Sequence, residues 1–96
     1  MAYTLPLTAA PTKARWKVKI RDKEIREPPH VTIIRGTDAW RINLRKKDFM
    51  DDAPDPSQVP DVLIDHIMAE NTWRRLCEAW DRMYPSNPVA NLKHEE

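Results

Sequence analysis

Residues 14–22 read Ala-Arg-Trp-Lys-Val-Lys-Ile-Arg-Asp, the clearest secondary-structure pattern in the chain. Large apolar side chains alternate with cations along it: Trp16, Val18 and Ile20 share one parity, and Lys17, Lys19 and Arg21 share the other. Successive side chains of a β-strand point to opposite faces of its sheet. The pattern therefore predicts a half-buried strand with one apolar face and one cationic face.

Two further strands are predicted downstream. Residues 30–35 (HVTIIR) carry apolar side chains on both parities, which suits the central strand of three. Residues 39–45 alternate again, with Trp40, Ile42 and Leu44 inward and Arg41, Asn43 and Arg45 outward. The single glycine, Gly36, lies between these two segments, where a hairpin needs a positive φ.

The acidic half of the chain is predicted to be helical. After a proline-rich linker at residues 51–60, the apolar residues of 61–84 form two stripes that point in nearly opposite directions on one helix. A break near residues 70–72 resolves this conflict, with Asn71 or Thr72 capping the second helix. The predicted fold is therefore α+β: a three-stranded antiparallel sheet followed by two C-terminal helices packed on one face.

Length and composition indicate one small domain. We expect a disordered N-terminus at residues 1–12, a single α+β domain at 13–84 and a disordered C-terminal tail at 85–96. The absence of a signal-peptide pattern, of a long apolar run and of a second cysteine predicts a cytoplasmic protein with no membrane association. With one glycine, the chain has no glycine-rich phosphate loop, which excludes P-loop and Rossmann proteins.

Charge is divided along the chain. Residues 13–47 carry twelve Lys and Arg against four Asp and Glu, a formal charge of +8, whereas residues 48–96 carry four against eleven, a formal charge of −7. The formal net charge of +1 hides this division. Folding is expected to place opposite potentials on different parts of one small surface, which suits a charged partner.

The predicted binding residues are the outward cations of the sheet. They are Lys17, Lys19, Arg21, Arg41 and Arg45. Because like charges side by side destabilise a sheet, their retention on one face favours a phosphate-bearing or acidic partner. The alternative is a solvated face that keeps a small sheet soluble. The tryptophans fall on the opposite parity, which argues against single-strand base stacking.

His30 is the candidate for chemistry. It follows Pro28-Pro29 at the start of a strand, where the backbone is stiff, and such a histidine can act as a general base. No second group lies at a recognised catalytic spacing, so a structural role is the competing interpretation.

No metal site or cofactor is predicted. The histidines lack metal-ligand spacing, and the aspartates of residues 48–55 lack the EF-hand pattern and its glycine. Cys77 falls on an apolar helical stripe, which indicates a core residue and not a nucleophile.

Two segments resemble a family of small uncharacterised bacterial proteins, catalogued as a domain of unknown function. Residues 28–31 read P-P-H-V where that family has P-P-H-V-H, and residues 70–80 end in L-C-E-A-W where it has roughly L-L-E-A-W. This chain has Thr32 in place of the second histidine. The resemblance implies a cytosolic bacterial protein, sometimes encoded beside a small partner in the manner of toxin–antitoxin pairs, with His30 as a possible site residue.

The sequence thus favours a non-enzymatic interaction module whose basic sheet face binds nucleic acid or an acidic protein. The alternative is a small ribonuclease-type toxin in which His30 is the base and Arg41 or Arg45 steadies the phosphate. A structural protein without a ligand is the third possibility.

Overall fold

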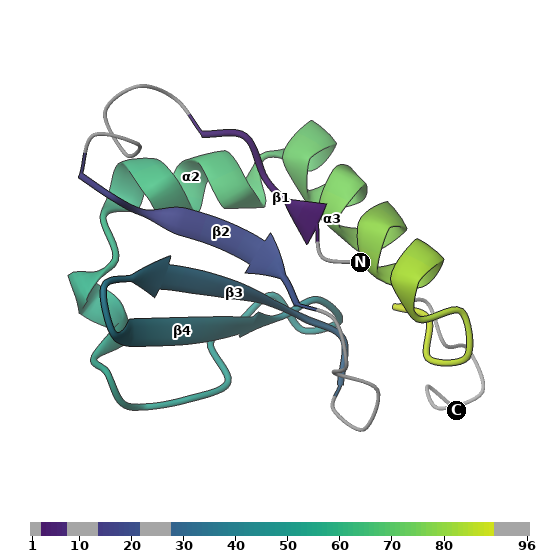
Figure 1. Cartoon of the computed structure of the whole chain (residues 1–96), viewed down its shortest axis with the longest axis horizontal. Helices are drawn as coiled ribbons and strands as arrows, with labels where there is room; N and C mark the ends of the chain where they lie inside the picture. The colour runs from purple at the N-terminus through teal and green to yellow at the C-terminus, as the bar shows by residue number, and fades with distance from the viewer. Residues whose placement is uncertain (1–2, 8–13, 22–27, 90–96) are drawn as a thin grey trace.

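The computed structural model describes residues 3–7, 14–21 and 28–89. It is an α+β structure with an antiparallel sheet in the order β1-β2-β3-β4, followed by two helices (Figure 1). The elements are β1 (Tyr3–Thr4), β2 (Lys17–Ile20), β3 (His30–Arg35), β4 (Asp38–Asn43), the short 3-10 helix η1 (Pro56–Gln58), α2 (Asp61–Met68) and α3 (Glu70–Met83).

The sheet has four strands, and the prediction of three is corrected. The additional strand, β1, pairs antiparallel with β2 in the register Tyr3↔Ile20, and the amide of Leu5 donates to the carbonyl of Val18 at 2.9 Å. These residues belong to the segment that we expected to precede the domain. A two-residue strand is too short to show alternation, and it forms because the open edge of β2 offers backbone partners.

The hairpin between β3 and β4 forms where the sequence predicts it. Arg35 pairs with Asp38 across Gly36 and Thr37, and Gly36 has a φ of +61°. β3 pairs with β2 on one side and with β4 on the other, so the segment with apolar residues on both parities is an interior strand. The register places Thr32, Ile33 and Ile34 of β3 between partners on β2 and β4, and this determines which side chains share each face of the sheet.

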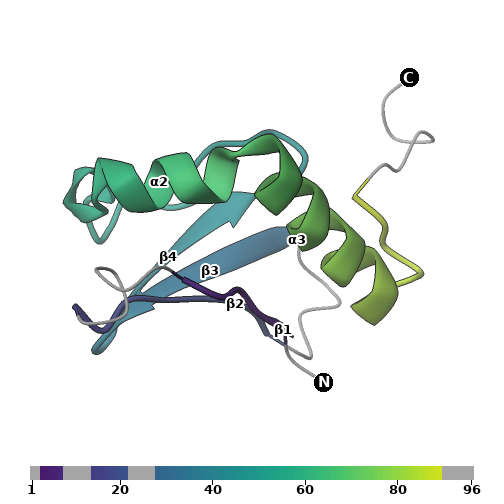
Figure 2. The same cartoon turned by 90° about the horizontal axis from the view of Figure 1, so that it is seen from above.

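The apolar parity of the strands forms the core, as the alternation predicts. The buried residues of this face include Trp16, Val18, Ile20, Val31, Ile33, Trp40 and Ile42. Leu63 and Ile67 of α2 and Leu76 of α3 are completely buried in the same cluster. Figure 2 shows both helices on one side of the sheet, with α2 lying across it and α3 sloping away at one end. Packing both helices on this side leaves the opposite parity as the outer face.

The break between the helices falls at Ala69, one residue before the predicted region. Ala69 has φ −57° and ψ 139°, which is extended backbone, and it is the N-cap of α3 without a side-chain cap bond. Asn71 and Thr72 lie inside α3, so their predicted capping role is wrong. The break reorients the apolar stripe, so that both helices bury theirs against one core.

Folded contacts continue past the end of α3. Trp80 donates from Nε1 to the carbonyl of Asn87 at 2.8 Å, and the amide of Val89 donates to Asp81 at 2.8 Å. Residues 85–89 belong to the segment that we expected to be a tail, and residues 90–96 lie outside the described part. None of the helices in the described ranges is long and apolar enough to cross a lipid bilayer.

Candidate binding face

The candidate face is the side of the sheet opposite the apolar core, and at one end of it His30 is buried against Trp80 of α3. Strand register places Lys19, Thr32 and Arg41 in one row across β2, β3 and β4, and Thr4 extends the row onto β1. Lys17 lies in a neighbouring row with Ile34 and Ala39. Paired residues of adjacent strands have Cβ atoms about 4.5–5.5 Å apart, so Lys19 and Arg41, on either side of the buried Thr32, are close enough to act on one ligand.

Three of the predicted binding residues form what we call the cationic strip: Lys17, Lys19 and Arg21. Lys17 and Arg21 are exposed and Lys19 is half-buried. Within the described ranges, none of the three side chains forms an ion pair or a hydrogen bond. Alternate side chains along a strand are about 6.6–6.8 Å apart, which sets the spacing of Lys17 and Lys19, and Arg21 follows directly after β2.

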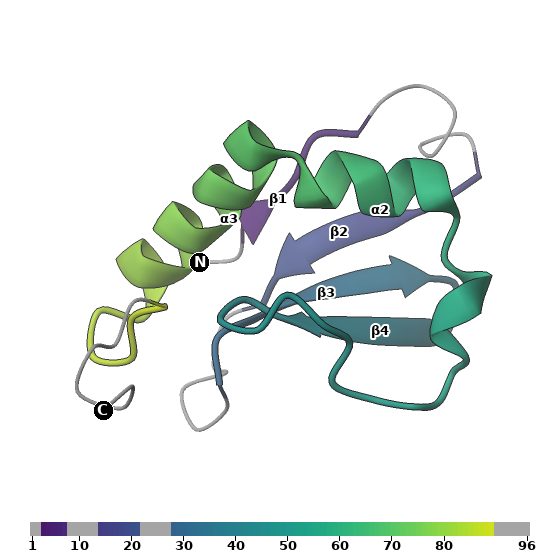
Figure 3. The same ribbon diagram turned by 180° about the vertical axis from the view of Figure 1, so that it is seen from behind.

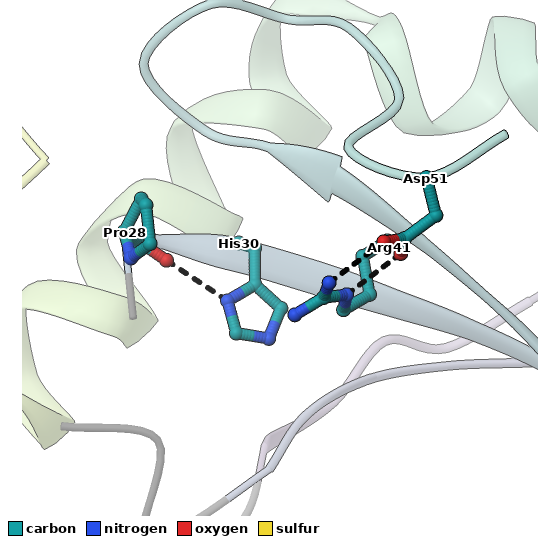
Figure 4. Close-up of polar contacts among 4 residues, drawn as sticks. All are labelled: Pro28, His30, Arg41 and Asp51. Atoms are coloured by element: carbon teal, nitrogen blue, oxygen red, sulfur yellow. Dashed lines mark hydrogen bonds and ion pairs between the residues drawn. The ribbon is translucent and has the colours of Figure 1, made fainter. Parts of the chain in front are cut away.

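Arg41 points outward, as the alternation predicts. It also forms an ion pair that the sequence does not indicate. Its Nε and Nη2 donate to the two carboxylate oxygens of Asp51 at 2.8 and 2.7 Å (Figure 4). The side chains are 32% and 34% exposed, so the pair lies at the surface. The hydrogen bond from Arg41 holds the pKa of the Asp51 carboxyl below its usual value.

Asp51 reaches Arg41 because the chain folds back along the outer edge of β4. Phe49 forms a bridge with Ile42, and the amide of Met50 donates to the carbonyl of Arg41 at 2.8 Å. Figure 3 shows the chain after β4 running beside the sheet before it enters η1 and α2. The sequence marks residues 51–60 as a linker, and no pattern in it signals that its first residue pairs with a strand cation.

Arg45 lies apart from the cationic strip. It follows β4 in a turn, and its guanidinium donates to the carbonyls of Val89 and Pro88 at 3.0 and 2.7 Å and to the side chain of Asn87 at 3.1 Å. The alternation predicts that Arg45 points outward with Arg41, but β4 ends at Asn43 and the register no longer applies. Arg45 fastens residues 87–89 and does not join the predicted face.

His30 is buried and held on two sides. It is 2% exposed, its Nδ1 lies 2.9 Å from the carbonyl of Pro28, and its ring centroid lies 5.5 Å from that of Trp80. A carbonyl oxygen only accepts, so Nδ1 carries the proton. Figure 4 shows His30 and Arg41 projecting from the same side of the sheet. A general base must reach its substrate, and a ring this deeply buried favours the structural interpretation.

Cys77 shows none of the features of a reactive thiol. The residue is half-buried, and burial, reinforced by the nearby Asp81 carboxylate, raises the pKa of the thiol. The ammonium group of Lys47 lies over the ring of Trp73, 5.1 Å from its centroid, a contact that no sequence pattern indicates. No group of three His, Cys, Asp or Glu side chains within the described ranges could hold a metal ion.

Comparisons with known proteins give no relative. No family model matches the chain, and no curated protein and no solved structure matches it significantly. The family resemblance of residues 28–31 and 70–80 therefore stays a prediction. The features that bear on function are those of the outer face of the sheet.

Proposed function

We propose that this protein is a non-enzymatic interaction module that binds a charged partner through the cationic strip. The observation that carries the proposal is the contrast among the five predicted cations. Arg41 and Arg45 are held by other parts of the chain, whereas Lys17, Lys19 and Arg21 form no ion pair or hydrogen bond through their side chains within the described ranges. Like charges on neighbouring outward positions repel, and a polyanion relieves that repulsion.

The partner is nucleic acid or an acidic protein. All four tryptophans are buried, and the outer-face positions of the described strands hold no Phe, Tyr or Trp, so the face contacts a charged backbone or carboxylates and not stacked bases. The single cysteine is compatible with a reducing cytoplasm. If the family resemblance holds, the partner is encoded beside this chain, in an arrangement like that of toxin–antitoxin pairs.

A double charge reversal tests the proposal. Lys17→Glu with Lys19→Glu should abolish retention of a mixed-sequence RNA duplex or of polyglutamate at low salt. The matched control is Lys46→Glu with Arg75→Glu, which makes the same change in net charge at two exposed positions away from the strip. Binding that is absent in the unmodified protein, or that falls equally in both double variants, would refute a role for the strip.

A further inference from the structure

Arg41 lies on β4, at a position from which its charge could enlarge the cationic strip. It shares the cross-strand row of Lys19, with Thr32 between them, so it would extend the cationic strip from β2 to β4. Its guanidinium instead holds both oxygens of Asp51. The Asp51 carboxylate comes from the loop after β4, and it accepts the same two parallel hydrogen bonds from Arg41 that a phosphate group would accept.

We propose that Asp51 is a built-in competitor, and that Arg41 becomes a further phosphate-binding position when a nucleic-acid duplex docks on the cationic strip. This inference rests on the proposed function and names its partner. In the absence of the duplex, Asp51 neutralises Arg41 and limits the strip to β2. When the duplex binds, a backbone phosphate takes the place of the carboxylate, and the contact spans β2 to β4.

The exchange is feasible because the ion pair is partly exposed at the surface. Both side chains are about one-third accessible, at 32% and 34%. Surface ion pairs contribute little net free energy, since water and salt ions compete for both partners. Asp51 comes directly after Met50, whose amide donates to the backbone carbonyl of Arg41. The carboxylate of Asp51 can therefore move away while this backbone hydrogen bond keeps the chain attached to the edge of β4.

The competition favours phosphates over the carboxylates of an acidic protein. A carboxylate of a protein partner would bind Arg41 no more strongly than the carboxylate of Asp51 does. Asp51 also has a higher effective concentration, because the chain tethers it beside Arg41. A duplex brings closely spaced phosphates whose condensed counterions are released on binding, a gain that an isolated carboxylate lacks. A duplex also keeps its bases stacked internally, which fits a face whose described positions carry no Phe, Tyr or Trp.

The test compares Asp51→Asn with Asp52→Asn in binding to a 16-base-pair mixed-sequence RNA duplex. Both variants lose one negative charge in the same loop, but Asp52 is exposed and forms no ion pair with a described residue. Asp51→Asn should tighten binding by about two- to fivefold more than Asp52→Asn. It should also steepen the dependence of log K on log salt concentration by about 0.7–0.9, as one added phosphate contact does. Adding Arg41→Gln to Asp51→Asn should remove both effects.

The outcomes separate this inference from the proposed function. If the duplex binds and the reversal of Lys17 and Lys19 abolishes binding, but Asp51→Asn matches Asp52→Asn, the competitor is refuted and the strip stands. If the duplex does not bind while polyglutamate does, the partner is an acidic protein and this inference fails. If neither probe binds, both proposals fail. Circular dichroism of each variant verifies that loss of binding does not reflect unfolding.

Discussion

Lys19 and Arg41 occupy one row of the sheet with only Thr32 between them, yet their electrostatic situations differ. Arg41 is bound by Asp51 through two hydrogen bonds, whereas the side chain of Lys19 has no ion pair in the described ranges. Alternation along a strand determines which residues share a face, but it does not determine which of them stay available. Of the five predicted cations, three therefore form the cationic strip, and a fourth, Arg41, lies beside it but is engaged by Asp51.

The carboxyl of Asp51 should titrate at a lower pH in the intact protein than in the Arg41→Gln variant. The guanidinium favours the ionised carboxyl, so the folded pKa lies below the unfolded value of about 3.9. The stabilisation from the pair is therefore complete well above that pH and is lost as the pH falls through the folded pKa. Side-chain carbon shifts in NMR measure the titration midpoint, and an unchanged midpoint in Arg41→Gln would contradict the pairing.

Arg45→Ala should loosen residues 87–89 and lower the free energy of unfolding by about 1–3 kcal/mol, because three hydrogen bonds to that segment are lost. Arg45→Lys keeps the charge but not the planar fork, and should recover only part of the loss. Chemical denaturation gives the stability, and hydrogen exchange of the Val89 amide reports the segment directly. Full recovery in Arg45→Lys would show that charge alone matters there.

His30→Ala should lower the free energy of unfolding by about 2 kcal/mol or more, because it leaves a cavity beside Trp80 and removes the bond to Pro28. Under conditions where the variant is folded, its affinity for a polyanion should equal that of the unmodified protein. Denaturant titration and a binding assay measure the two quantities separately. A stable variant with altered binding would move His30 from the core to the functional site.

Gly36→Ala should destabilise the protein by about 1 kcal/mol, since the backbone there has φ +61°, which L-residues adopt at a cost. Apart from its two chain neighbours, no residue has an atom within 4 Å of a Cβ built at this position, so the cost comes from the local backbone conformation and not from tertiary contacts. Gly36→Asn should cost less, because asparagine tolerates this region better. Urea denaturation compares the two, and an Ala variant as stable as the Asn variant would contradict the argument.

The predicted elements that formed are those with a strong local pattern. The alternation around Trp16 and Trp40 gave the correct buried parity for β2 and β4, and the opposed stripes of residues 61–84 required the break that appears at Ala69. Each of these signals depends only on neighbours within a few positions. β1 was missed because two residues carry no periodicity and are held by the edge of β2.

The placement of the candidate residues on one face of the sheet was predictable in part, for the same reason. Lys17, Lys19 and Arg21 follow from alternation alone, since all three lie in or directly after one strand. The partners of Arg41 and Arg45 lie 10 and 42–44 residues away along the chain, beyond the reach of any periodic pattern. The burial of His30 likewise depends on Trp80, which approaches it only once α3 has packed.

The amino-acid sequence by itself determined the parity of each strand, the positive-φ turn at Gly36 and the separation of basic from acidic segments, because these depend on residue type and short spacing. Which of the strand cations are engaged by other described residues depends on contacts between segments far apart in the chain. The physical reason is that an ion pair or a multiple hydrogen bond needs two groups within about 3 Å. For Arg41 and Arg45, the folding back of residues 48–51 along β4 and of residues 87–89 toward Arg45 brings such groups together.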